Sequence, residues 1–138
     1  MHSPTSRTGS TAPTTAQLSL IRMAMLGGVL LFGAIAWWTR RNDPAPAATA
    51  AMRNILGVAP LALGIVALST VVLLRRVLAR EGDPARQATL RIIGWATGET
   101  AALAGGVSYF LTGDASSYFI GLAVLMFTFV GLPVPERR

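Results

Sequence analysis

The chain of 138 residues contains no cysteine, no lysine, one histidine and six acidic residues. Without cysteine, disulfides, thiolate catalysis and thiolate metal sites are excluded. The one histidine, His2, lies in a polar stretch at the N-terminus, so a metal site built from histidine ligands is not expected. We therefore expect no bound metal and no cofactor.

Charged residues are also scarce. They make up 13% of the chain, whereas 52% of the residues are hydrophobic. The apolar residues form four long blocks, and each block approaches the roughly 20 residues that a helix needs to cross a bilayer. This composition is not that of an ordinary soluble domain. It predicts an all-α, polytopic membrane protein with four transmembrane helices.

The four blocks divide the chain into two tails and one membrane domain. Residues 1–17 are rich in Ser, Thr and Pro, which predicts a disordered cytoplasmic tail. We expect a four-helix transmembrane bundle over 18–133 and a short cytoplasmic tail over 134–138. The predicted spans are 18–38, 55–76, 91–111 and 117–133. Thr112-Gly113-Asp114 is predicted to form the turn between the last two spans, because Gly and Asp suit turns.

All twelve basic residues are arginine, a usage typical of GC-rich bacterial genomes. With four spans, three of them fall on one side of the membrane: Arg40, Arg41 and Arg53. The other nine fall on the opposite side: Arg7, Arg22, Arg75, Arg76, Arg80, Arg86, Arg91, Arg137 and Arg138. The positive-inside rule then places both termini in the cytoplasm. We expect a multi-pass protein of the bacterial inner membrane, with lipid as its surroundings and no nucleic acid as partner, because no basic-aromatic patch exists.

Glu99 is the one acidic residue inside an apolar block. A carboxylate in hydrocarbon costs several kcal/mol unless it is paired, protonated or wet. Small residues at spacings of three and four follow the same helix: Gly94, Gly98, Ala101, Gly105 and Ser108. Such a face allows helix backbones to approach closely. We expect a helix-packing face there, with Glu99 beside it in a helix–helix seam.

The depth of Glu99 in the membrane narrows its candidate partners. At 1.5 Å per residue, Glu99 lies about 18 Å from Leu111 at the outer end of its span, and Arg22 lies about 24 Å from Trp38 on a parallel helix. The difference of about 6 Å is within reach of an arginine side chain. Hydroxyl groups at similar levels are Ser69, Thr70 and Thr128. These residues and Arg22 are the predicted partners of Glu99.

Two interpretations of Glu99 remain open. In the first, Glu99 is a structural anchor, and the protein is a small non-enzymatic accessory or assembly subunit that packs against other membrane helices or against itself. In the second, Glu99 binds a proton or a cation, and the protein is a small carrier or proteolipid. No second group converges with Glu99 and no loop exceeds about 17 residues, so we do not expect an enzyme.

Two resemblances bear on these interpretations. The chain resembles a loose group of small, uncharacterised four-span bacterial inner-membrane proteins. The segments that carry this likeness are 25–32, 92–99, 109–114 and 133–136. Over about twenty residues around Glu99, the third block also looks like the carboxylate helix of subunit c, the rotor proteolipid of ATP synthase. That resemblance implies an ion-carrying role for Glu99. The preceding loop has Ala85-Arg86-Gln87 where that family has Arg-Gln-Pro.

Overall fold

A computed structural model describes residues 13–42 and 49–134. This part of the chain is all-helical, with four helices and no strand. The helices are α1 (Thr15–Asn42), α2 (Ala50–Leu78), α3 (Pro84–Thr112) and α4 (Ala115–Gly131). Their number and order agree with the four apolar blocks of the sequence.

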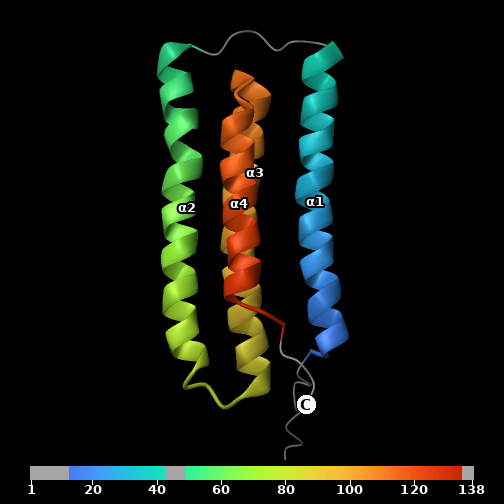
Figure 1. Cartoon of the computed structure of the whole chain (residues 1–138), viewed down its shortest axis with the longest axis vertical. Helices are drawn as coiled ribbons and strands as arrows, with labels where there is room; N and C mark the ends of the chain where they lie inside the picture. The colour runs from blue at the N-terminus through green and yellow to red at the C-terminus, as the bar shows by residue number, and fades with distance from the viewer. Residues whose placement is uncertain (1–12, 43–48, 135–138) are drawn as a thin grey trace, which may run out of the picture.

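Helix α3 is the centre of the arrangement, because it contacts each of the other three helices. Its most extensive contact is with α4. Helices α1 and α2 lie on opposite sides of the α3–α4 pair (Figure 1), and within the described residues they do not touch each other. The contact between α1 and α4 is sparse. The core therefore lies along the faces that α3 and α4 present to each other and to the outer helices.

The N-terminus of α1 corrects one prediction. The helix begins at Thr15, so residues 15–17 are helical and do not belong to a disordered tail. The Thr14 hydroxyl accepts from the Gln17 N–H at 3.3 Å, and the Gln17 side chain accepts from the Thr14 N–H at 2.8 Å. This reciprocal pair is a capping box, which satisfies two backbone donors at the helix start. The rest of the predicted tail, residues 1–12, lies outside the described residues.

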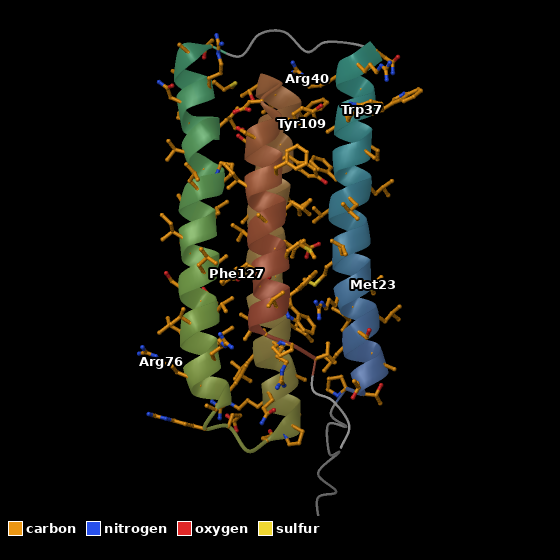
Figure 2. The ribbon with its side chains drawn as sticks, in the orientation of Figure 1. Met23, Trp37, Arg40, Arg76, Tyr109 and Phe127 are labelled. Carbon is orange, nitrogen blue, oxygen red and sulfur yellow. The ribbon has the colours of Figure 1, made fainter. Side chains whose placement is uncertain are left out.

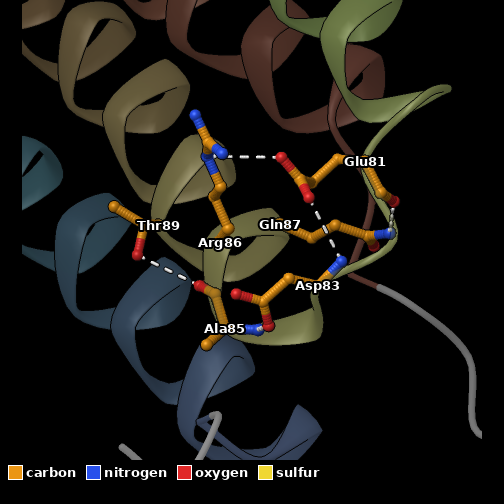
Figure 3. A network of polar contacts seen from close by, with 6 residues as sticks. All are labelled: Glu81, Asp83, Ala85, Arg86, Gln87 and Thr89. Atoms are coloured by element: carbon orange, nitrogen blue, oxygen red, sulfur yellow. Dashed lines mark hydrogen bonds and ion pairs between the residues drawn. The ribbon is translucent and has the colours of Figure 1, made fainter.

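The connection between α2 and α3 is held by a local polar network (Figure 3). The Arg86 guanidinium pairs with the Glu81 carboxylate at 3.2 Å, and that carboxylate also accepts from the Asp83 N–H at 3.2 Å. Asp83 caps α3 by accepting from the Ala85 N–H at 3.0 Å. Pro84 follows as the first helical residue, a position where its missing N–H costs nothing. The network lies at one end of the molecule and fixes the turn between the two helices.

The turn between α3 and α4 is confirmed at Thr112-Gly113-Asp114. Gly113 ends α3 in the left-handed region at φ 81°, which glycine adopts without a Cβ clash. Asp114 then caps α4 by accepting from the Ser116 N–H at 3.0 Å. Hydrogen bonds from the side chain and backbone of Ser116 hold the pKa of Asp114 below its ordinary value. The Asp114 carboxylate is therefore charged at neutral pH at this end of the molecule.

Two helices of the described chain, α1 and α2, are long and apolar enough to cross a membrane. Only 17% and 22% of their most apolar stretches are buried, whereas the core helix of a soluble protein would be mostly covered. Apolar side chains project outward along both helices, from Met23 to Trp37 on α1 (Figure 2). Helix α4 is apolar but has 17 residues.

The helix boundaries contain the first three predicted spans, and they correct the fourth. The span predicted over 117–133 extends past the end of α4 at Gly131. Leu132 has φ −126° and ψ 72°, outside the helical region. The residue before a proline is disfavoured in the α conformation, so Pro133 ends the helix two residues early. Of the C-terminal tail predicted over 134–138, residues 135–138 lie outside the described residues.

Candidate functional site

The small face of α3 is used inside the molecule. Its five residues are all buried. A Cβ on Gly98 would collide with the Thr128 side chain, and a Cβ on Gly105 would collide with the Ser117 carbonyl oxygen. Both neighbours belong to α4. The absence of side chains at these positions therefore lets α4 approach the backbone of α3 closely. The full set is Gly94, Gly98, Ala101, Gly105 and Ser108.

Next to the small face, α3 contacts α4 through an aromatic pair, Trp95 and Phe129. We call this contact the seam. The Trp95 indole N–H donates to the Leu132 carbonyl at 2.9 Å in a buried hydrogen bond. Its ring meets Phe129 edge to face, with centroids 6.1 Å apart and planes at 87°. The Arg22 guanidinium of α1 lies over the same Phe129 ring, 4.7 Å from its centroid. Phe129 thus links three helices at this level.

Glu99 lies at the edge of this seam, on the side of α3 that faces α1. Gly106 follows Glu99 by seven residues, which is almost two full helical turns. Phe32 of α1 packs against Gly106 so closely that a Cβ there would lie 2.6 Å from its ring. The Glu99 side chain is partly buried. Across residues 13–42 and 49–134 its carboxylate has no hydrogen bond and no ion pair.

The structure does not bring the four predicted partners onto the Glu99 carboxylate. Arg22 lies on Phe129, as described above. Thr70 donates to the Val66 carbonyl at 2.8 Å, within its own helix. Thr128 donates to the Leu125 carbonyl at 2.7 Å and is fully buried against Gly98. Ser69 is exposed on α2. The hydroxyl groups are therefore engaged locally or turned away from Glu99.

A groove lies beside Arg22. It runs between α1 and α4 and has a volume of about 410 Å³. Its polar lining comes from the start of α1, and its apolar lining comes from both helices and from the residue Val134 after α4. The lining residues are Thr15, Ser19, Arg22, Met23, Leu26, Met126, Phe129 and Val134. We call it the Arg22 groove. The groove was not predicted from the sequence. The polar residues Thr15, Ser19 and Arg22, at spacings of four and three, do indicate a polar strip on one face of the first helix.

A second hollow lies at the opposite end of the molecule, between α2 and the α3–α4 turn. It has a volume of about 240 Å³ and is lined by Arg53, Ser108 and Asp114, among others. The Ser108 hydroxyl is buried and is the one buried side-chain polar atom of the described residues without a hydrogen-bond partner. Ser108 is the last residue of the small face and lines this hollow together with Asp114 of the α3–α4 turn.

No metal-binding constellation occurs in the part of the chain that the structure describes: no three His, Cys, Asp or Glu residues gather there. No family model, no curated protein and no solved structure matches this chain. Within the described residues, Glu99 and Arg22 are two charged side chains that lie at helix–helix contacts without an ion pair.

Proposed function

We propose that this protein is a small, non-enzymatic integral membrane protein that packs against the helices of another membrane protein as an accessory or assembly subunit. In this proposal all four helices cross the bacterial inner membrane, and both termini are cytoplasmic. The apolar outer surfaces of α1 and α2 support it, together with arginines at both ends of the helices.

The observation that carries the proposal is the carboxylate of Glu99, which lies on the central helix and finds no partner among the described residues. A charged carboxylate at this depth costs several kcal/mol when it is unpaired. A donor or a cation from another chain would remove that cost. The small face of α3 is already covered by α4, so the partner has to approach where Glu99 is partly exposed, beside α1.

A second observation locates room for such an approach. Gly27 and Gly28 are exposed on α1, and a Cβ at either position would meet nothing within 4 Å. Exposed glycines allow a neighbouring helix to come close to the backbone in lipid. Helix α1 is also only loosely attached to α4. A partner helix can therefore pack along α1 without displacing the α3–α4 core.

The deciding experiment is purification of the tagged full-length protein from native membranes in mild detergent, followed by a native gel and identification of co-purifying proteins. We expect a larger complex of fixed stoichiometry. Glu99→Gln should weaken binding of the partner at least about thirtyfold, because an unpaired buried charge on the partner costs about 2–5 kcal/mol or more. Asp114→Asn is the matched control, since this carboxylate is exposed in a turn, and recovery should not change.

The alternative function, a proton- or cation-linked proteolipid, is favoured by the same unpartnered and partly exposed carboxylate, because an acidic group in this position within a membrane helix often binds a transported ion. In that case the purified protein would form a homo-oligomer without another protein. Proteoliposomes would show a proton or cation flux, and Glu99→Gln would abolish the flux at unchanged expression. That combination of results would replace the accessory-subunit proposal.

A further inference from the structure

The Arg22 groove has a positively charged part and an apolar part. The hydroxyl residues Thr15 and Ser19 and the guanidinium of Arg22 line one part of it, and all three come from the first two turns of α1. Met23, Leu26 and Met126 line the rest. A ligand that fits must therefore have an anionic head and an apolar body.

Arg22 has no anionic partner inside the described part of the molecule. Its guanidinium stacks on Phe129 and makes neither an ion pair nor a hydrogen bond there. Stacking on a ring covers one face of the guanidinium and leaves its N–H donors, which lie in the plane of the group, free to bind an anion. A fork of N–H donors matches the oxygens of a phosphate group.

The groove opens sideways, toward the region that lipid would occupy. Met23 and Met126 line it and are 63% and 43% exposed. Because the contact between α1 and α4 is sparse, a flexible chain can lie between them. A small soluble anion would use the guanidinium but would leave this apolar wall uncovered.

The depth of Arg22 suits a lipid headgroup. Arg22 precedes Trp38 by 16 residues, or about 24 Å of helix. The hydrocarbon core is about 30 Å thick. With Trp38 at one interface, the guanidinium has to extend about 6 Å to reach the phosphate level of the opposite leaflet, which an arginine side chain can do.

From these observations we infer that the Arg22 groove binds one anionic phospholipid of the cytoplasmic leaflet. The phosphate contacts the Arg22 guanidinium and the hydroxyls of Thr15 and Ser19. One acyl chain lies over Met23, Leu26 and Met126. This lipid site goes beyond the proposed accessory role, and it rests on one part of that proposal, namely that α1 crosses the membrane with its N-terminus in the cytoplasm.

Native mass spectrometry of the full-length protein in mild detergent tests this inference. The probes are phosphatidylglycerol and phosphatidylcholine with identical acyl chains. The unmodified protein should retain one phosphatidylglycerol at concentrations where phosphatidylcholine is not retained. Arg22→Gln should weaken phosphatidylglycerol binding about tenfold, because hydrogen bonds to a charged group are lost. Arg22→Lys should lose less affinity than Arg22→Gln, since it keeps the charge but not the planar fork of N–H donors.

The matched control is Arg76→Gln. Arg76 is exposed on α2, in the same half of the molecule as Met23, the residue that follows Arg22 (Figure 2), and does not line the groove. This variant should bind phosphatidylglycerol like the unmodified protein. Should Arg22→Gln fail to fold by circular dichroism, Ser19→Trp decides instead: Ser19 is exposed, and the larger side chain should fill the groove with a similar loss of affinity.

Four results would overturn the inference. Phosphatidylcholine could be retained equally well, or Arg76→Gln could lose as much affinity as Arg22→Gln. Inorganic phosphate at millimolar concentration could displace the lipid completely, which would indicate a soluble anion site. Finally, lipid could bind only after Glu136→Gln. Glu136 follows the groove-lining residue Val134 by two positions, so that result would indicate that the chain's own C-terminus occupies the groove.

Discussion

At the scale of single residues, Trp95 and Glu99 differ in how their polar side-chain atoms are accommodated in a mostly apolar helix. Both carry polar atoms on the central helix. The Trp95 N–H is buried and satisfied by the Leu132 carbonyl at 2.9 Å, whereas the Glu99 carboxylate is partly exposed and has no such partner in the described chain. A satisfied buried group specifies the fold, and an unsatisfied one is available for binding. We therefore expect Trp95 to stabilise the fold, and Glu99 is the candidate functional residue.

Replacing Trp95 with phenylalanine should test this division. Trp95→Phe keeps an aromatic ring for Phe129 but leaves the buried Leu132 carbonyl without its donor. We expect the free energy of unfolding to fall by about 1–3 kcal/mol, measured by circular dichroism during titration with a denaturing detergent. Trp38→Phe is the control: Trp38 is 65% exposed, and its change should stay within about 0.5 kcal/mol. Equal losses in both variants would contradict the assignment.

At the scale of elements, the α3–α4 pair is held by close backbone contact. Gly121 of α4 lies against α3: a Cβ there would be 2.6 Å from the Ala101 carbonyl oxygen and 2.7 Å from the Ala102 Cα. These are backbone atoms, which cannot turn away as the end of a side chain can. The two helices therefore behave as one unit, and α1 and α2 are attached to its sides.

Gly121→Ala should accordingly separate α3 from α4. Overpacking of this kind costs about 1–3 kcal/mol, and we expect a lower midpoint of thermal unfolding in detergent, followed by size-exclusion chromatography with fluorescence detection. Gly28→Ala is the matched control, because a Cβ at Gly28 meets nothing within 4 Å. The midpoint of this variant should equal or exceed that of the unmodified protein, since alanine is the better helix former. A normal midpoint for Gly121→Ala would show that the pair is loosely packed.

At the scale of the whole molecule, the arginines fall at the two ends of the helices. Arg40 and Arg53 lie at the end that carries the α3–α4 turn, where the Arg40 guanidinium donates to the Phe110 carbonyl at 2.9 Å. Arg76 and Arg86 lie at the end that carries the α2–α3 connection. The second end holds more of the positive charge of the sequence, so in the proposed spanning arrangement we expect it on the cytoplasmic side.

Labelling of single cysteine variants checks this orientation, because the chain has no cysteine of its own. In intact cells that express the protein, a membrane-impermeant maleimide should modify Asn42→Cys and Ser116→Cys. Gly82→Cys should react only after the membrane is opened. All three positions are exposed. The reverse pattern would place both termini outside, and labelling of all three in intact cells would contradict a spanning arrangement.

The sequence alone determined the number, order and approximate limits of the helices, since apolar block length and turn residues act locally. The Thr112-Gly113-Asp114 turn was predicted because Gly and Asp suit turns. In the structure Gly113 adopts a positive φ and Asp114 caps α4. The two errors at the ends had local causes that the sequence did contain. These were the capping box of Thr14 and Gln17 and the effect of Pro133 on Leu132.

Only the tertiary structure decided which side of each helix meets which neighbour. The apolar blocks have almost no polar face. Their hydropathy therefore does not show which side of each helix is turned toward its neighbours. For this reason the sequence could not show that the small face of α3 meets α4, that Arg22 rests on Phe129, or that Glu99 is without a partner in the described chain. These contacts depend on how four mostly apolar helices pack together, and steric fit between side chains and glycine backbone decides that packing.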